Sequence, residues 1–498
     1  MRTRHFFKQM FVSGLAMALL ASGSVQAATT APYDPAAWKA DYAQLKSVLE
    51  KEYANLAWFG SFEGGADLPW LDKRTQAALA AARTDDEARL ALTQFVARFH
   101  DGHFSVLPTL TPAATPPLTV SRQDFDPNDP VSTCAGLGFL PSSAIAFSMP
   151  LEGLPGFKLR FDGMSSVYRA GIATTAAGIK IGVIRIQNFR MRAFPGACTL
   201  AWAKLVRDQK PITSESVRDA AYKLWFDAFR DEMEALRADG ASMILVDVGN
   251  NSGGDDTGDY FPRMLTDKAV KSAPLRVVAS PTGTQYLNES IRDIDEALAD
   301  TLSPAAHDAF VEARAYYAHA KDQVATSACD MSWVWRDRRH YPAIACTRTV
   351  AAGYAGGYFA GLPKGIYGDK SAWLSLPSEI EDRWGTWTGP VYVLTDGKSY
   401  SSAEMFTAVV QDNHIGKTVG QKTGGDGCGF MVEAEPVTLT HSRLRLRIPN
   451  CMRIRADGRD EVAGISPDLP ILPTEGEDDR QRAARMLETI AADAANHH

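Results

Sequence analysis

The sequence predicts an α/β fold built around a parallel sheet, and three observations support this prediction. Two continuous apolar runs, at residues 243–248 and 390–395, have the length of strands that are buried on both faces, as in a parallel sheet. Each run lies next to an amphipathic helix pattern, at residues 216–238 and 402–413. A further strand-like run at residues 181–186 precedes the first helix, so strands and helices alternate along the chain.

The first segment of the mature chain is predicted to be a bundle of helices. Asp34 followed by Pro35 is a typical helix start, and Thr84 with Glu87 three residues later forms a capping box that starts another helix. Apolar residues then recur at helical spacing in both segments: Trp38, Tyr42, Leu45 and Leu49 in the first, and Leu92, Phe95, Val96 and Phe99 in the second. The loop that carries His103 follows this bundle directly.

The chain is long enough to divide into several domains. We predict a signal peptide (1–27), an N-terminal helical bundle (28–106), a linker or degenerate PDZ-like region (107–179), a first half of the α/β core (180–269), an insertion that could cap the site (270–385), a second half of the core (386–472) and a C-terminal helix or tail (473–498).

The PDZ alternative depends on one short motif. Gly136-Leu137-Gly138-Phe139 is typical of the loop with which PDZ domains bind the carboxylate of a peptide C-terminus. Six prolines from Pro108 to Pro130 interrupt regular structure just before it, and no further PDZ pattern occurs before Ile181. A linker is therefore the main interpretation.

The N-terminus and the composition indicate an exported protein. Basic residues precede an apolar run at residues 10–21, and Val25-Gln26-Ala27 completes a secretory signal peptide with expected cleavage after Ala27. We expect a periplasmic or secreted protein without a membrane span, because no later run approaches about 18 apolar residues. The net charge of -7 argues against nucleic acid as a partner. The oligomeric state is not indicated.

Six cysteines in an exported chain, with no Cys-x-x-Cys pair, favour disulfides over metal ligands. Cys428 and Cys451 flank two strand-like runs around a turn and could face each other across a hairpin. Cys329 and Cys346 would close a short loop, which leaves Cys134 with Cys198 by elimination.

Ser401 is the candidate nucleophile. It lies in Thr395-Asp396-Gly397-Lys398-Ser399-Tyr400-Ser401, between an apolar strand and a predicted helix. Free amides at a helix N-terminus can stabilise developing negative charge, and the amide of Ser402 would be one such donor. For an isolated match, a plain serine N-cap would be the better interpretation.

A second motif, Asn250-Asn251-Ser252-Gly253-Gly254, follows the strand at residues 243–248 directly. It is expected at the carboxyl edge of the sheet, where ligands bind in open α/β sheets. Gly253 or Gly254 would let a backbone amide approach a substrate carbonyl and act as the second oxyanion donor. Alone, the motif would be an ordinary turn.

Together with Asp101-Gly102-His103 and Gly464-Ile465-Ser466-Pro467-Asp468, these motifs resemble the C-terminal-processing (tail-specific) serine protease family, in its tricorn-like branch. The resemblance implies a crotonase-like α/β core. It also implies a serine endopeptidase that forms an acyl-enzyme on Ser401, with a peptide or an unfolded protein as substrate and no cofactor.

The resemblance also distinguishes two catalytic arrangements. Lysine-dependent members carry their base in a Gly-Lys-Gly segment, which here reads Gly425-Asp426-Gly427, and Asp426 cannot serve as an amine base. The tricorn-like arrangement implies His103 as general base and Glu461 as the carboxylate that orients it, directly or through a hydroxyl. The tricorn protease has serine where this chain has Gly102, so a bridging hydroxyl must come from elsewhere, for example Ser402.

Three alternatives remain at this level. His100, Asp101 and His103 cluster in sequence, but their spacing matches no zinc motif, so no metal is expected. The same scaffold also resembles that of a retinoid-binding protein, which would make this chain a non-catalytic ligand-binding protein. A small-ester hydrolase would keep the chemistry and change the substrate.

Overall fold

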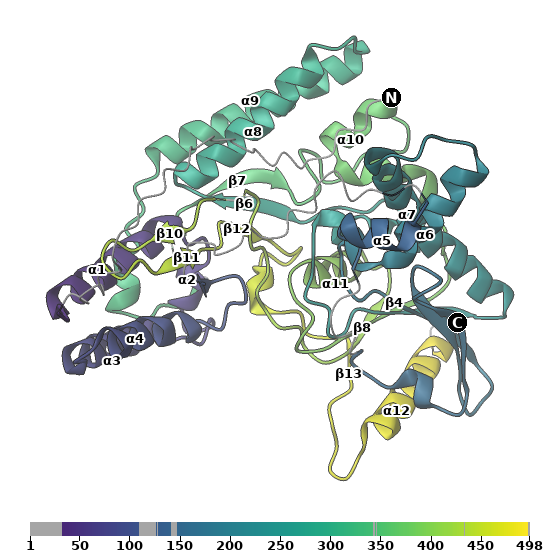
Figure 1. The fold of residues 1–498 in the computed structure, drawn as a ribbon, viewed down its shortest axis with the longest axis horizontal. Coiled ribbons are helices and arrows are strands. Elements are labelled where there is room, and N and C mark those ends of the chain that lie inside the picture. Colours follow the sequence, from purple (N-terminus) through teal and green to yellow (C-terminus); the bar gives the residue numbers. More distant parts are fainter. Residues whose placement is uncertain are drawn as a thin grey trace, which may run out of the picture.

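The computed structural model describes residues 32–108, 126, 128–140, 147–341, 344, 346–432 and 434–496. The predicted signal peptide at residues 1–27 lies outside the described residues. A sheet of seven strands lies at the centre of the α/β core, in the order β13-β9-β8-β5-β4-β3-β2 (Figure 1). Its strands are β2 (Phe157–Asp162), β3 (Arg169–Thr174), β4 (Lys180–Arg185), β5 (Met243–Asp247), β8 (Val391–Thr395), β9 (Lys417–Gly420) and β13 (Leu469–Pro470).

The predicted α/β fold is confirmed, with a mixed rather than a purely parallel sheet. The three apolar runs form β4, β5 and β8, which pair in parallel with one another and with β9 and β13. In addition, β2 and β3 extend the sheet in antiparallel fashion beyond β4. Both come from the segment predicted as a linker. The composition of β3, Arg-Ala-Gly-Ile-Ala-Thr, has too few large apolar residues to be recognised as a strand.

The Gly136-Leu137-Gly138-Phe139 motif does not form a carboxylate-binding loop. It lies at the end of α5 (Pro130–Gly136), where the amide of Gly138 donates to the carbonyl of Ala135 and that of Phe139 donates to Cys134. The ring of Phe139 is buried in the core. A peptide carboxylate would need amides that this helix end already uses.

Helices cover both faces of the seven-stranded sheet. The C-terminal helix α12 (Asp479–Ala495) packs on one face, through a cluster that includes Met486 and Ile490. On the other face, α6 (Pro195–Arg207), α7 (Ser214–Ala238) and α11 (Ser402–Asp412) share one hydrophobic core. Figure 1 shows this layered arrangement in the right half of the molecule.

The described residues 32–108 form four helices: α1 (Pro35–Glu52), α2 (Leu56–Phe59), α3 (Leu68–Ala81) and α4 (Asp85–Ala97). The predicted helix starts are confirmed, because Asp34 accepts from the amides of the first turn of α1 and Thr84 Oγ1 accepts from the amide of Glu87. The Glu87 carboxylate accepts from Arg83 N, one residue before the expected partner.

The helical segment does not close its own core. Its hydrophobic cluster includes Trp333, Leu439, Leu444 and Leu446 from distant parts of the chain. Three short strands complete this contact: β1 (Ser105–Leu107), β10 (Val437–Thr438) and β11 (Arg445–Arg447). Since β1 follows the His103 turn and pairs with β11, the turn is fixed against the C-terminal part of the chain.

The segment between the two halves of the core contributes β6 and β7 to a second, small sheet, in the order β12-β6-β7, and β12 comes from the second half of the core. Its strands are β6 (Pro274–Val278), β7 (Thr349–Tyr354) and β12 (Cys451–Arg453), and the helical hairpin of α8 (Pro281–Leu298) and α9 (Pro304–Thr326) packs on it (Figure 1). The remaining short helices are η2 (Leu151–Gly153), η3 (Met191–Ala193), η4 (Asp256–Asp259), η5 (Phe261–Leu265), η6 (Ser332–Trp335), η8 (Gly368–Lys370), α10 (Ser371–Leu374), η9 (Leu376–Arg383) and η10 (Glu461–Ala463).

All three predicted disulfides are present: Cys134–Cys198, Cys329–Cys346 and Cys428–Cys451. The third pair does not lie across the predicted hairpin. The hairpin of β10 and β11 exists, but Cys451 lies on β12, which pairs with β6. The disulfide therefore joins the loop after β9 to the small sheet.

None of the described helices has both the length and the hydropathy that a membrane-spanning helix needs.

Candidate active site

Ser401 lies in the tight turn between β8 and α11, as the sequence predicted for this element. Its φ of 53° is in the left-handed region, which is uncommon for a residue with a side chain and recurs at functional sites. The turn is fixed on both sides, because Ser399 Oγ donates to the carbonyl of Val248 and Tyr400 N donates to the carbonyl of Asn251. The side chain of Ser401 is therefore held at the carboxyl edge of the sheet.

The glycine motif packs directly against the candidate nucleophile. A Cβ atom on Gly253 would lie 2.6 Å from Ser401 Cβ, so only glycine permits this approach. The amide of Gly253 donates to Asn251 Oδ1 and is not available to a substrate. Within the described residues, the amides of Gly254 and Ser402 have no acceptor. Of the two glycines considered as the second oxyanion donor, only Gly254 therefore has an amide that could donate to a substrate.

His103 is held in the turn that follows α4. Asp101 Oδ1 accepts from His103 N at 2.8 Å, and Tyr53 donates to Asp101 Oδ2. The imidazole is mostly buried, with Nδ1 3.2 Å from the carbonyl oxygen of Asp426 and the ring edge against Phe430. Burial lowers the pKa of His103 below its usual value, and the nearby Asp101 carboxylate opposes this shift.

Asp426, which the sequence excludes only as an amine base, contacts both candidate catalytic residues. Its Oδ1 accepts from Ser401 N at 2.8 Å, and its Oδ2 lies 3.5 Å from His103 Nδ1. Burial, together with the charge of Asp101, raises the pKa of Asp426 to about 6. One sequence signal could have identified it, because Gly102 and Asp426 are both departures from the family pattern and meet here.

Glu404 holds the loop that carries Asp426. Its fully buried carboxylate accepts from Thr423 Oγ1 and from the amides of Gly425, Asp426 and Gly427. The amide of Ser401 is also within 3.2 Å. Burial and the neighbouring Asp426 raise the pKa of Glu404 to about 7. This one side chain fixes the loop relative to the nucleophile turn.

Glu461 is not brought to His103: in the described part of the chain, no hydrogen bond or ion pair joins the two. The buried Glu461 carboxylate instead pairs with Arg453, whose Nε lies 2.6 Å from Oε2. Arg453 also donates to the carbonyl oxygens of Ser401 and Gly427. Glu461 therefore supports the backbone on either side of the site through Arg453.

Two further expectations from the sequence concern the hydroxyl of Ser402 and a metal site. Ser402 Oγ donates to the carbonyl of Asp255 at 2.6 Å, so it does not bridge His103 and Glu461. Among the described residues, no group of histidine, cysteine, aspartate and glutamate side chains is arranged to hold a metal ion.

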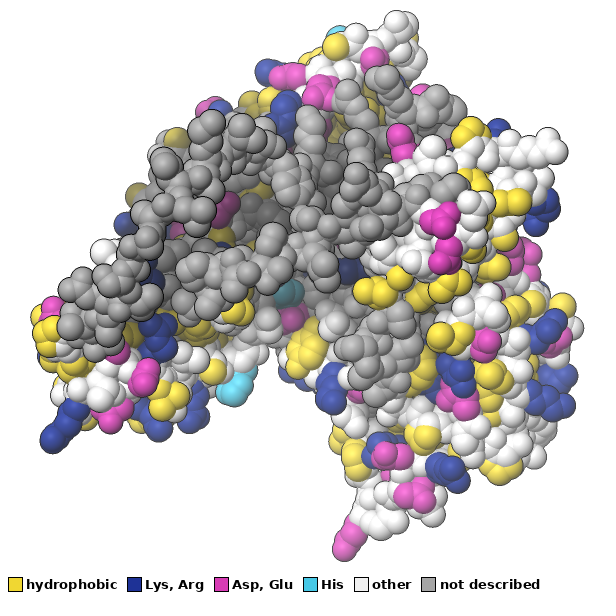
Figure 2. Space-filling view, in the orientation of Figure 1, with side chains coloured by type: hydrophobic (Ala, Val, Ile, Leu, Met, Phe, Trp, Pro, Cys, Tyr) yellow, Lys and Arg dark blue, Asp and Glu magenta, His cyan; other side chains and the backbone are white. Residues whose placement is uncertain are grey.

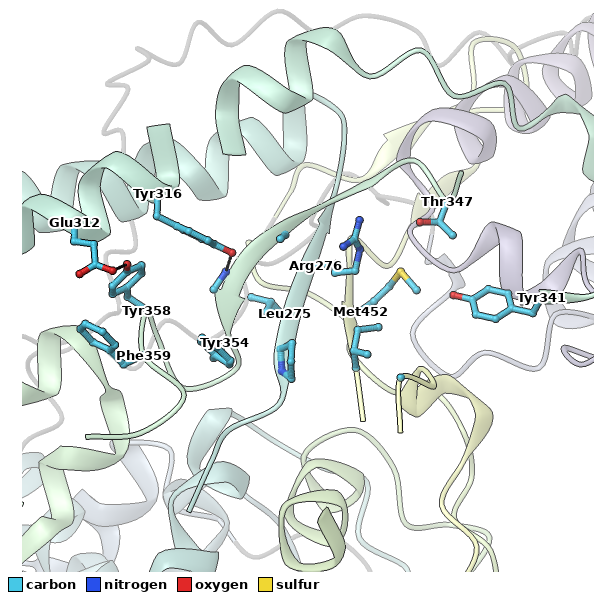
Figure 3. A pocket seen from close by; sticks show the side chains of 15 residues that line it. Leu275, Arg276, Glu312, Tyr316, Tyr341, Thr347, Tyr354, Tyr358, Phe359 and Met452 are labelled. Atoms are coloured by element: carbon cyan, nitrogen blue, oxygen red, sulfur yellow. Dashed lines mark hydrogen bonds between the residues drawn. The ribbon is translucent and has the colours of Figure 1, made fainter. Parts of the chain in front are cut away.

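A cavity of about 670 Å³ lies away from these residues (Figure 3). It lies across β6, β7 and β12, with Arg276 and Met452 in its middle and tyrosines toward both ends, and none of the residues named above lines it. At one end, Tyr358 donates to Glu312 and Tyr316 accepts from Gly353 N.

Comparison with known proteins shows the family to which the chain belongs. The model of Peptidase family S41 matches residues 180–471, more than half of the chain, so the chain belongs to this family. The resemblance found in the sequence is thereby confirmed, and the chain is a serine-type peptidase. None of the curated proteins compared with the chain matches it.

Several solved structures share the fold. Mature CPAF superposes with a TM-score of 0.55 at 14% identity, covering 93% of this chain and 98% of that one. Mature CPAF complexed with lactacystin gives 0.56 at 12% identity, covering 93% and 99%. The photosystem II D1 C-terminal processing protease matches at 12% identity, covering 90% and 98%, with a TM-score of only 0.35.

Proposed function

We propose that this protein is an endopeptidase that hydrolyses peptide bonds through an acyl-enzyme on Ser401, with His103 as general base. The observation that carries the proposal is that both residues contact Asp426, so nucleophile and base flank one side chain. Ser401 and His103 are separated by about 300 positions in the sequence, and the fold brings them to one place. The parallel ladder with helices on both faces supports a crotonase-like core for this site.

In the acylation step, His103 accepts the Ser401 hydroxyl proton on Nε2 while Oγ attacks the carbonyl carbon of the substrate. The carbonyl of Asp426 accepts from Nδ1–H and keeps Nε2 unprotonated beforehand. The oxyanion is stabilised by the amides of Ser402 and Gly254, each contributing on the order of a 10²–10³-fold rate increase.

Breakdown of the tetrahedral intermediate completes the first half of the reaction. The C–N bond breaks as the imidazolium returns its proton to the leaving amine nitrogen. His103 then takes a proton from water, whose oxygen attacks the acyl carbon, and the ester bond to Ser401 breaks with return of the proton to Oγ. No cofactor enters this sequence.

We propose exported peptides or unfolded proteins as substrates. The signal peptide predicted at residues 1–27 and the three disulfides support an oxidising compartment, either the periplasm or the cell exterior. Figure 2 shows a deep notch between the part that holds α1 to α4 and the part that holds α12, which would admit an extended chain. Acidic and basic side chains are interspersed over the described surface visible there.

Labelling of the purified mature protein with a fluorophosphonate tests this proposal, with the adduct mapped by mass spectrometry. We expect one adduct on Ser401, and its loss in S401A and H103A. The exposed Ser252 lies in the adjacent glycine motif, and S252A is the matched control that should still be labelled. An adduct elsewhere, or labelling that survives H103A unchanged, would contradict the assignment.

Substrate class is tested separately with the same variants. An internally quenched peptide should be cleaved at an internal bond, whereas a small activated ester should be a poor substrate. Turnover of esters alone would instead favour the small-ester hydrolase.

A further inference from the structure

We propose that Asp426 is the positioning residue of the catalytic histidine in this chain, in the role that the family resemblance gave to Glu461. This inference rests on the proposed function, since it concerns how His103 acts on Ser401.

Asp426 meets His103 with two different groups. Its backbone carbonyl lies 3.2 Å from Nδ1 and its carboxylate Oδ2 lies 3.5 Å from the same atom. Both are acceptors, so both favour the tautomer with hydrogen on Nδ1 and leave Nε2 to take a proton. The carboxylate adds a negative charge that stabilises the imidazolium formed when Ser401 loses its proton.

Asp426 is itself held in place by the nucleophile turn. Its Oδ1 accepts from Ser401 N at 2.8 Å, and its own amide donates to the buried carboxylate of Glu404. The carboxylate is 6% exposed, so its charge is screened little by water. One residue thus sets the position of the imidazole relative to the serine.

Gly102 makes this contact sterically possible. A Cβ atom at residue 102 would lie 2.8 Å from Asp426 Oδ2, closer than a side-chain carbon tolerates. The serine that the tricorn protease has at this place would collide with the carboxylate in its present position. The two departures from the family pattern are therefore one coupled change: the side chain missing at 102 makes room for the carboxylate at 426.

Glu461 is not free to perform this role. Its charge is neutralised by Arg453, and Arg453 is in turn committed to the carbonyls of Ser401 and Gly427. The other charged groups around His103 are Asp101, whose Oδ1 lies 3.9 Å from Nδ1, together with Glu404 and Arg453. Asp101 is engaged by the amide of His103 and by Tyr53, so it fixes the turn, and its charge also favours the imidazolium.

The test compares D426N with E461Q, using kcat/KM on a peptide substrate as a function of pH and the rate of fluorophosphonate labelling. The D426N variant would keep an acceptor for Ser401 N and the backbone carbonyl, but would lose the negative charge. We expect kcat/KM to fall about 10–100-fold and the acid limb of the profile to move to lower pH by about one unit. In E461Q the acid limb should stay at its wild-type pH.

Two further variants make the result decisive. In G102A the new methyl group should displace the Asp426 carboxylate, so the limb should move in the same direction although Asp426 is retained. D457N changes an exposed carboxylate that pairs with Arg459 and should leave the whole profile unchanged. If D426N lowers activity only by unfolding, as thermal denaturation would show, G102A alone decides between the outcomes.

The proposal is overturned if the limb moves in E461Q and stays in place in D426N and G102A, even when D426N is less active. Failure of the proposed function itself has a different signature. In that case S401A and H103A would retain the activity and the labelling of the unmodified protein, whatever the behaviour of residue 426.

Discussion

Two segments place carboxylates near the candidate site, and the two carboxylates have different partners. In the loop at residues 423–429, Asp426 contacts His103 and Ser401, and amides of the same loop donate to the carboxylate of Glu404. The segment at residues 451–463 contains Glu461, which matches the family position but is bound to Arg453. A glutamate at the family's position therefore need not orient the histidine, because its nearest partner decides whether its charge is available to the imidazole.

The largest effect is expected from breaking the ion pair of the second segment. In R453M, Glu461 would remain buried without a partner and two carbonyls would lose their donor, so the free energy of unfolding should fall by about 3–5 kcal/mol. Urea denaturation measures this change. The double variant R453M/E461L should recover part of the loss, and a double variant less stable than R453M would show that the pair is not the cause.

The disulfide between the two segments should have the next largest effect. Cys428–Cys451 closes a loop with a sequence separation of 23 residues, so C428S/C451S should lower the free energy of unfolding by about 3 kcal/mol. Because Cys428 lies two residues after Asp426, peptidase activity should fall by more than it does in the Cys329–Cys346 double variant. Equal activity in the two variants would mean that the disulfide does not hold the loop in place.

Substitution of Glu404 should lower the free energy of unfolding less than the two changes above, and should mainly displace the loop at residues 423–429. In E404Q the side chain has one acceptor oxygen in place of two, so at least one loop amide loses its partner, at a cost of about 1–3 kcal/mol. We expect slower fluorophosphonate labelling together with a lower unfolding midpoint in urea. Labelling at the rate of the unmodified protein would show that the position of this loop does not affect the reactivity of Ser401.

The pH dependence of stability should distinguish the two segments most finely. A carboxyl group whose pKa is raised in the folded state stabilises folding fully below its unfolded pKa of about 4, and loses this contribution as pH rises through the folded pKa. The folded pKa values are about 7 for Glu404 and about 6 for Asp426 and Glu461. Unfolding temperatures should therefore fall as the pH rises from about 4 to about 7.

Variants assign the pH effect to one segment. E404Q should flatten the fall more than E461Q does, because the pKa of Glu404 is raised further than that of Glu461. The lowered pKa of His103 works in the opposite direction, since its contribution is lost as pH falls below about 6.5. H103A should accordingly steepen the fall, and a flat profile in the unmodified protein would contradict the burial of these groups.

What the sequence could predict follows from the range of the interactions involved. The strand before Ser401 and the helix after it are set by local apolar patterns, and they form where predicted, as β8 and α11. The start of α1 could likewise be predicted from Asp34 and Pro35, since a helix cap involves only neighbours in the chain.

The parts that escaped prediction depend on contacts between distant segments. The sequence pattern around Asp426 shows only that it cannot replace a lysine, whereas the contacts that define its proposed role come from Gly102 and Ser401, which meet it only in the folded chain. The strands β2 and β3 have weak local patterns and are stabilised by pairing along β4. Local sequence patterns therefore predict neither the contacts of Asp426 nor the pairing of β2 and β3.

The support of the His103 turn also has a consequence for the order of events during synthesis. Strand β1 pairs with β11, and Leu439, Leu444 and Leu446 complete the core beneath helices α1 to α4. A growing chain therefore has no complete support for its histidine until about residue 447 has been made, well after Ser401. A nascent or truncated polypeptide that ends before β11 contains Ser401 but lacks the strand that fixes the His103 turn, so the proposed site can form only late in synthesis.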